Sequence, residues 1–132
     1  MTTEQNRLVA VVLEVADLDR SAALYRDGFG VPLKAPDDHE GGDGADRWVS
    51  GRHCATSWTD GAFLHFALYE AKTEERSTHA QISFAVTDLA AAHVQAVGAG
   101  ASVLHEPRTE EWGRSARYRD FDGNVIELTQ PG

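Results

Sequence analysis

The chain has 132 residues, of which 42% are hydrophobic and 25% are charged, and this composition predicts one ordinary globular domain. Its net charge of −9 argues against a nucleic-acid partner and is compatible with a cationic ligand. The single cysteine, Cys54, excludes an intramolecular disulfide, and the absence of an apolar leader or of a long apolar run predicts a cytoplasmic protein that does not contact a membrane.

The first half of the chain is expected to contain one helix and four strands. Asp17 caps the helix and Gly28 ends it, and an acidic, glycine-rich loop occupies 36–46. The expected elements are a strand over 8–15, a helix over 17–28, a short strand over 31–35 and a hairpin of strands 52–58 and 62–69.

The second half repeats this order after a polar linker over 71–78. Its expected elements are a strand over 80–86, a helix over 88–98, a short strand over 102–105, a loop over 106–112 and a hairpin of strands 114–120 and 124–130. The halves match at 15–18 and 86–89 with an offset of 71, and at 61–66 and 123–128 with an offset of 62. We therefore expect a single domain, 1–132, built from two modules at about 7–70 and 79–130 that pair around a pseudo-twofold axis.

Side chains on alternate positions of the strands predict an inner surface. In the last strand Val125, Glu127 and Thr129 point to one side, and a carboxylate there costs several kcal/mol to bury unpaired. Glu127 should therefore face a cavity, a metal ion or a ligand. The expected inner surface comprises Ala10, Val12, Glu14, Phe63, His65, Tyr69, Gln81, Ser83, Val125, Glu127 and Thr129. This mixture of aromatic, small and acidic groups favours a concave pocket, while the facing of strands 52–58 and 114–120 stays open.

Two stretches resemble a known family. The sequence VADLDRSAALY at 15–25, followed by Gly28-Phe29-Gly30, resembles the first strand and helix of the vicinal oxygen chelate superfamily. Trp112-Gly113-Arg114 and the sequence DFDGNVIEL at 120–128 resemble its last hairpin. This superfamily includes glyoxalase, extradiol dioxygenases, fosfomycin-modifying enzymes and bleomycin resistance proteins. The resemblance implies an α+β fold in which two βαβββ modules curl into a cup, often completed across a homodimer.

The resemblance also indicates where a metal ion would bind. Metal enzymes of this superfamily carry ligands on the first and last strands of each module, at positions occupied here by Ala10, His65, Gln81 and Glu127. Ala10 has no donor atom and Gln81 offers only an amide oxygen, so we expect no metal or other cofactor. If a divalent ion does bind, its ligands are His65, Gln81 and Glu127.

Acidic and aromatic residues of the expected cup are candidates for ligand recognition. Glu14 either recognises an amine or guanidine of a ligand or forms an internal ion pair with Arg117 or Arg119. By resemblance Trp112 lies at the mouth of the cup and contacts the ligand, Trp48 occupies the matching place in the first half, and Trp58 is structural. The expected ligand-binding residues are Glu14, Trp48, Phe63, His65, Tyr69, Gln81, Ser83, Trp112 and Glu127.

The missing ligand at Ala10, the aromatic and acidic inner surface and the negative charge favour a binding protein. We expect a homodimer related to the bleomycin resistance-type proteins that sequesters an aromatic, cationic small molecule without turnover. The alternative is a metal-dependent lyase or dioxygenase that uses His65, Gln81 and Glu127. A third possibility is metal-free acid–base catalysis by Glu127 or Glu14.

Overall fold

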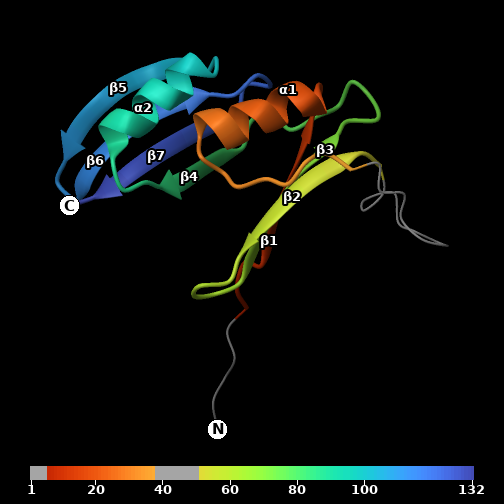
Figure 1. Cartoon of the computed structure of the whole chain (residues 1–132), viewed down its shortest axis with the longest axis horizontal. Coiled ribbons are helices and arrows are strands. Elements are labelled where there is room, and N and C mark those ends of the chain that lie inside the picture. The colour runs from red at the N-terminus through yellow and green to blue at the C-terminus, as the bar shows by residue number, and fades with distance from the viewer. Residues whose placement is uncertain (1–5, 38–50) are drawn as a thin grey trace, which may run out of the picture.

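The described part of the chain, residues 6–37 and 51–132 of a computed structural model, forms two mixed sheets and a few helices (Figure 1). The elements are β1 (Ala10–Val15), α1 (Leu18–Ala23), η1 (Leu24–Gly28), β2 (His53–Trp58), β3 (Leu64–Glu70), β4 (Gln81–Ala85), α2 (Leu89–Gly98), β5 (Ser102–Glu110), β6 (Gly113–Arg119) and β7 (Val125–Pro131). This architecture confirms the predicted α+β class.

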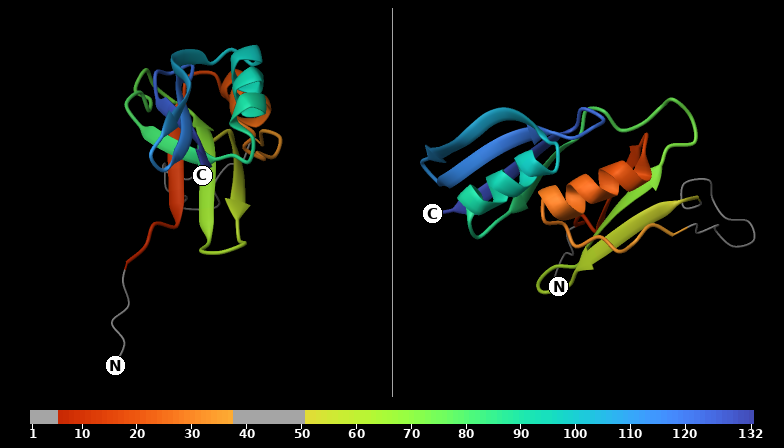
Figure 2. Two further views of the ribbon diagram at one scale, coloured as in Figure 1. Left: turned by 90° about the vertical axis from the view of Figure 1, so that its left-hand side faces the viewer. Right: turned by 45° about the horizontal axis from the view of Figure 1, so that its top comes forward.

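Each module contributes one sheet. The first sheet has the order β1-β3-β2 and the second has the order β4-β7-β6-β5. In each sheet the strand before the helix pairs in parallel with the last strand of its module, and the remaining pairs are antiparallel. Both helices lie on the same side of the sheets, which leaves the opposite side uncovered by helices (Figures 1 and 2).

Both helices begin where the sequence predicts. Oδ1 of Asp17 accepts a hydrogen bond from the Arg20 amide at 3.2 Å, and Oδ1 of Asp88 accepts one from the Ala91 amide at 3.1 Å. These bonds satisfy amide groups that have no partner within the first turn of a helix. The first helix continues after α1 as the wider turn η1, which ends at Gly28.

Two predicted elements are wrong. Residues 31–35 do not form a regular strand, because Pro32 has no amide hydrogen and the Leu33 amide bonds back to the Val31 carbonyl at 2.7 Å. The segment still runs beside β2, where the Lys34 amide donates to the Ala55 carbonyl at 3.2 Å. In the second module β5 continues to Glu110 through the expected loop, with irregular pairing on both sides of His105.

The register of the strands also differs from the sequence repeat. His65 lies beside Ala10 in the first sheet, whereas Glu127 lies beside Ser83 in the second. Gln81 pairs instead with Val125, two positions along the same face. The offset of 71, which relates Ala10 to Gln81, and the offset of 62, which relates His65 to Glu127, therefore cannot both relate residues at equivalent places in the two sheets. Ser83 is the immediate neighbour of Glu127.

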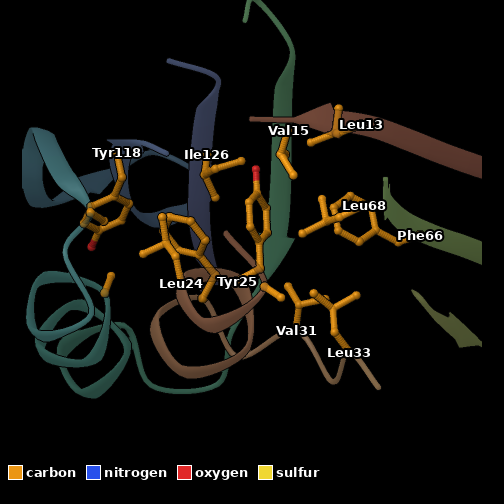
Figure 3. Close-up of a cluster of buried hydrophobic side chains, with 14 of the residues drawn as sticks. Leu13, Val15, Leu24, Tyr25, Val31, Leu33, Phe66, Leu68, Tyr118 and Ile126 are labelled. Atoms are coloured by element: carbon orange, nitrogen blue, oxygen red, sulfur yellow. The ribbon is translucent and has the colours of Figure 1, made fainter. Parts of the chain in front are cut away.

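The buried side chains of the described residues form a cluster that includes both modules (Figure 3). Tyr25 lies between Ile126 on one side and Leu68 and Phe66 on the other. Its ring centroid is 5.7 Å from that of Phe66. The first module thus packs against the second through its helix, where η1 contacts α2 directly, and through its sheet, where the ring centroid of Phe66 lies 5.7 Å from that of Phe84.

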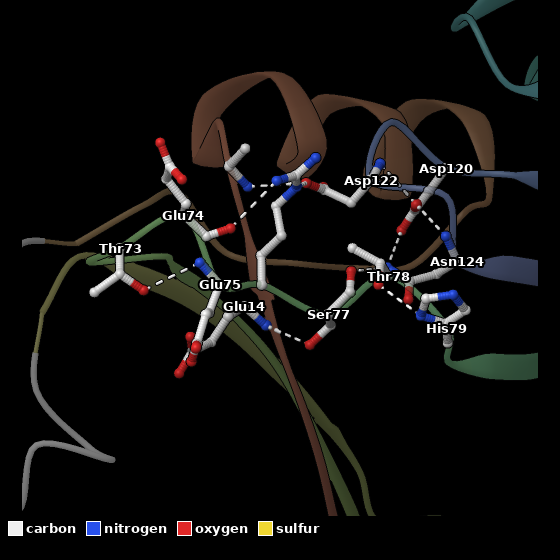
Figure 4. A network of polar contacts seen from close by, with 12 residues as sticks. Glu14, Thr73, Glu74, Glu75, Ser77, Thr78, His79, Asp120, Asp122 and Asn124 are labelled. Carbon is white, nitrogen blue, oxygen red and sulfur yellow. Dashed lines mark hydrogen bonds and ion pairs between the residues drawn. The ribbon is translucent and has the colours of Figure 1, made fainter.

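A buried polar network around the last turn also joins the modules (Figure 4). The Tyr25 hydroxyl donates to Oδ2 of Asp120 at 2.6 Å, and Oδ1 of Asp120 accepts from the amides of Asp122 and Asn124. Nδ2 of Asn124 donates to the Ser77 carbonyl at 2.7 Å. The Asp-Phe-Asp-Gly-Asn motif therefore serves packing between the modules.

Candidate functional site

The sheet sides opposite the helices are exposed, as the alternation predicts. Along β1, Ala10, Val12 and Glu14 are exposed while Leu13 and Val15 are buried. We call the uncovered side of the first sheet the first inner face; its strand residues and the adjoining Phe63 are Ala10, Val12, Glu14, His53, Ala55, Ser57, Phe63, His65, Ala67 and Tyr69. The second inner face comprises Gln81, Ser83, Ala85, Ser102, His105, Arg108, Glu110, Ser115, Arg117, Arg119, Val125, Glu127 and Thr129.

The first inner face is largely apolar and aromatic. Val12 and Phe63 are each 49% exposed, so both offer apolar surface to a ligand. The rings of His53 and Tyr69 are stacked, with centroids 4.7 Å apart and planes inclined by 10°. These groups offer flat surfaces on which a planar ring can pack.

His65 is engaged by a neighbour on the same face. Its Nδ1 lies 2.8 Å from Oγ of Ser57, its cross-strand partner. The pair lies at a cavity of about 340 Å³, which Lys34 and Asp37 also line. Cys54 pairs with Leu68 rather than with His65, and burial raises the pKa of its thiol, so it is poorly suited to nucleophilic chemistry.

Glu14 does not form the predicted internal ion pair. Its carboxylate makes no hydrogen bond or ion pair with the residues that the structure describes, while its amide donates to Oγ of Ser77 at 3.0 Å. Arg117 pairs with Glu127 instead, and Nη1 of Arg119 donates to the Gly123 carbonyl at 2.9 Å. Glu14 thus presents an exposed carboxylate at the edge of the apolar first inner face, with no partner among residues 6–37 and 51–132.

A polar row crosses the second inner face from β5 to β4. His105 pairs across the strands with Arg117, Arg117 with Glu127, and Glu127 with Ser83. Oε1 of Glu127 accepts from Oγ of Ser83 at 2.9 Å, and Oε2 accepts from Nε of Arg117 at 3.2 Å. The Glu127 carboxylate, whose side chain is 17% exposed, therefore already has a partner for each oxygen.

The sequence analysis did not identify three residues of this row and its surroundings as candidates for ligand binding: His105, Arg117 and Arg119. The available signal was the alternation in β6, where the apolar Ala116 and Tyr118 are buried and the arginines on either side of Tyr118 are exposed. His105 had no such signal, because the irregular pairing of β5 decides which way it faces.

The residues at the superfamily's metal positions do not fit a divalent ion within one chain. His65 and Glu127 lie on different sheets, and Glu127 is occupied by Ser83 and Arg117. Across residues 6–37 and 51–132, no three or more histidine, cysteine, aspartate or glutamate side chains are grouped closely enough to hold a metal ion.

The three tryptophans have different surroundings. Trp48 lies outside the described residues. Trp112 is 52% exposed at the turn between β5 and β6. Trp58 packs on the helix side against Phe84, with ring centroids 6.3 Å apart, in agreement with a structural role.

A second cavity lies on the helix side between the modules. Its volume is about 430 Å³, and it is lined mainly by apolar and aromatic side chains that include Val11, Phe29, Trp58, Ile82 and Phe84. Most of these side chains alternate with those of the inner faces along the same strands, although Ser83 and Ala85 of the second inner face also line the cavity. None of the helices in the described segments is long and apolar enough to cross a membrane.

Comparison with known proteins agrees with this geometry. The family model of the Glyoxalase/Bleomycin resistance protein/Dioxygenase superfamily matches residues 7–128. This match confirms the family resemblance of the two sequence stretches. No curated protein matches the chain at a significant level.

Solved structures with the same fold cover nearly the whole chain. TnmS3, an antibiotic binding protein from Streptomyces sp. CB03234, is 26% identical with a TM-score of 0.69, over 99% of this chain and 100% of that one. A glyoxalase/bleomycin resistance protein from the same organism is 25% identical with a TM-score of 0.65, over 94% and 100%. A glyoxalase-related enzyme from Fulvimarina pelagi is 16% identical with a TM-score of 0.67, over 96% and 88%, and this last similarity bears on the fold alone.

Proposed function

The chain belongs to the glyoxalase/bleomycin resistance protein/dioxygenase superfamily, and from this premise we propose that it binds and sequesters an aromatic small molecule without chemically changing it. The observation that carries this proposal is the first inner face, where Val12 is exposed near the stacked rings of His53 and Tyr69, and Phe63 is exposed at the other end of β3. Apolar groups exposed together in this way mark a binding surface. The similarity to TnmS3, an antibiotic binding protein, supports the same ligand-binding role.

A cationic group on the ligand is a finer part of the proposal. The Glu14 carboxylate adjoins the aromatic first inner face and lacks a partner in the described structure, so it is available to pair with an amine or guanidine. The net charge of −9 favours the approach of a cation over long distances.

The protein acts as a homodimer in this proposal. Within the described residues the two sheets do not close into a cup, and β1 and β4 each pair on one edge only. In the dimer the first inner face of one chain lies opposite the second inner face of its partner. This arrangement would enclose a ligand that a single open sheet leaves exposed to water.

The proposal includes no metal ion. Ala10 has no donor atom, and both oxygens of Glu127 are bonded to Ser83 and Arg117. A lyase or dioxygenase mechanism that depends on a bound metal would therefore have to break these contacts before a ligand set could form.

Isothermal titration with a panel of aromatic DNA-damaging antibiotics tests this function. We expect saturable binding by at least one compound at micromolar concentrations, recovery of that compound unchanged after prolonged incubation, and loss of binding in Phe63→Ala. Trp58→Phe, a change on the helix side, is the matched control and should leave the affinity unchanged. Conversion of the compound to a product, or no binding at concentrations well above micromolar, would contradict the proposal.

A further inference from the structure

The second inner face is basic, although the chain as a whole is acidic. It carries three arginines, Arg108, Arg117 and Arg119, against two carboxylates, Glu110 and Glu127. The net charge of the whole chain is −9, so this surface has the opposite sign to its surroundings. The contrast calls for an explanation from the individual side chains.

Arg117 is held in place by Glu127, and some of its hydrogen-bond donors have no partner in the described ranges. Its Nε donates to Oε2 of Glu127 at 3.2 Å, and Glu127 is fixed in turn by Ser83. The two Nη groups of Arg117 make no contact of this kind with any residue in the described ranges, and the side chain is 47% exposed. Glu127 thus acts as a positioning residue, which orients a guanidinium whose outer edge is available.

Arg119 carries a charge that no carboxylate of the described segments balances. It is exposed on the same strand and the same face as Arg117, two residues along, so the two backbones are about 7 Å apart. Its Nη1 donates to the Gly123 carbonyl, and it has no carboxylate partner in the part of the chain that is described. Two neighbouring guanidiniums therefore share one carboxylate, Glu127.

Arg108 does not add to this excess. Its Nε lies 2.7 Å from Oε1 of Glu110, and this bond holds the pKa of Glu110 below its ordinary value. His105, the cross-strand neighbour of Arg117, has a buried Nε2 with no hydrogen-bond partner among the described residues. The unsatisfied donors and the uncompensated charge thus coincide at Arg117 and Arg119.

We propose that the second inner face binds an oxyanion of the aromatic ligand, a carboxylate or an ionised phenol, through Arg117 and Arg119. Guanidinium groups match the planar geometry of such oxyanions and form charge-assisted hydrogen bonds to them. This inference rests on the proposed function and names the ligand class more closely. Because Glu127 is already bonded, a cationic group on the same ligand would pair with Glu14. The oxyanion site makes the preferred ligand an aromatic compound with an acidic end.

Three probes that share one ring system and differ in charge test whether an acidic group on the ligand increases its affinity. Naphthoate carries the oxyanion, naphthylmethanol is neutral and naphthylmethylamine is cationic, and each is titrated against the full chain by isothermal calorimetry. We expect naphthoate to bind about tenfold more tightly than naphthylmethanol, as a charge-assisted hydrogen bond predicts. Added salt should reduce this difference, because it screens charges that are exposed to solvent.

Matched arginine variants locate the effect. Arg119→Gln and Arg117→Gln should each remove the preference for naphthoate and leave the affinity for naphthylmethanol unchanged. Arg114→Gln is the control, since Arg114 lies on the same strand with its side chain on the opposite face. Thermal melting of every variant confirms that the fold is retained.

The outcomes distinguish this inference from the function on which it rests. If naphthylmethanol binds and naphthoate binds no better, or if Arg114→Gln reduces the preference as much as Arg119→Gln, the oxyanion site is refuted while ligand binding stands. If none of the three probes binds even at millimolar concentrations, the result counts against the binding function itself, and the inference falls with it.

Discussion

Nε of Arg117 lies 3.2 Å from Oε2 of Glu127 across β6 and β7, on the face of the sheet that is turned away from the helices. Glu127 occupies a position at which the metal enzymes of the superfamily are expected to carry a ligand. In this chain the same carboxylate holds an arginine. The pair therefore changes a position associated with metal binding into part of a basic surface.

Chelation should have no effect if Glu127 is committed to Arg117 and Ser83. We expect the thermal midpoint and the affinity for an aromatic ligand to be the same before and after dialysis against EDTA, because binding requires no divalent ion. Differential scanning calorimetry and elemental analysis of protein purified without chelators provide the measurement. A stoichiometric metal ion that is lost in His65→Ala would support the metal-dependent alternative instead.

Tyr25→Phe should destabilise the protein through the polar network that joins the modules. The substitution removes a 2.6 Å hydrogen bond to the buried Asp120 carboxylate, whose Oδ2 then keeps only the bond from Nδ2 of Asn124, and the loss of a hydrogen bond to a charged group costs about 1–3 kcal/mol of unfolding free energy. Urea denaturation provides the measurement. Tyr69→Phe is the control, since the Tyr69 hydroxyl has no hydrogen-bond partner within the described structure, and its effect should stay within about 0.5 kcal/mol. Equal losses in the two variants would show that the Tyr25 hydroxyl has no special role.

Stability should fall steeply above pH 10. Burial raises the pKa of Tyr118 to about 12 and, with help from the neighbouring Asp120 carboxylate, raises the pKa of Tyr25 well above its ordinary value of 10.0. The folded protein therefore keeps protons that the unfolded chain releases, and this stabilisation is complete below about pH 10 and is lost as the pH rises towards the folded-state pKa values. Each tyrosine contributes a slope of about 1.4 kcal/mol per pH unit in that range.

Urea denaturation between pH 9 and pH 12 measures this slope. Tyr118→Phe should reduce the slope by about half, because one of the two buried phenols is then absent. Ionisation of all tyrosines near pH 10 in the folded state, followed by ultraviolet absorbance, is the result that would refute the prediction.

Arg76→Ala should destabilise the protein far more than a comparable surface change. Nε of Arg76 lies 2.7 Å from Oδ1 of Asp122, whose side chain is 2% exposed, so the substitution leaves a buried carboxylate without its counter-ion. The expected loss is on the order of 3 kcal/mol. Arg26→Ala breaks the exposed pair with Asp27 and should cost less than about 1 kcal/mol. Similar unfolding free energies for the two variants would mean that the Asp122 pair is not buried in solution.

Local signals in the sequence predicted much of the fold. Asp17 and Asp88 each cap a helix by accepting a hydrogen bond from the amide three residues further along the chain, so this contact depends only on nearby sequence. The alternation along β1 placed Glu14 on the exposed side for the same reason. The strand predicted over 31–35 failed for a local reason, because Pro32 prevents a regular strand. The register of β4 on β7 depends on longer-range structure, and it decides that Ser83, not Gln81, adjoins Glu127.

The candidate site was only partly predictable. His65, Tyr69 and Glu127 were placed on inner faces from strand periodicity, and the strand pairing puts them there, while Phe63 is exposed just before β3. Arg117 was named only as one possible partner of Glu14, and its pairing with Glu127 was not predicted, because that pairing depends on the neighbouring strands and not on spacing along the chain. The roles of all these residues in ligand binding stay predictions.

The most direct test of binding between inner faces is a crystal structure of the protein with an aromatic ligand. Our account predicts a homodimer in which the aromatic ligand lies on the first inner face of one chain, with its acidic group bonded to Arg117 and Arg119 of the partner. A ligand found instead in the helix-side cavity beside Trp58 and Phe84, with both inner faces empty, would contradict it.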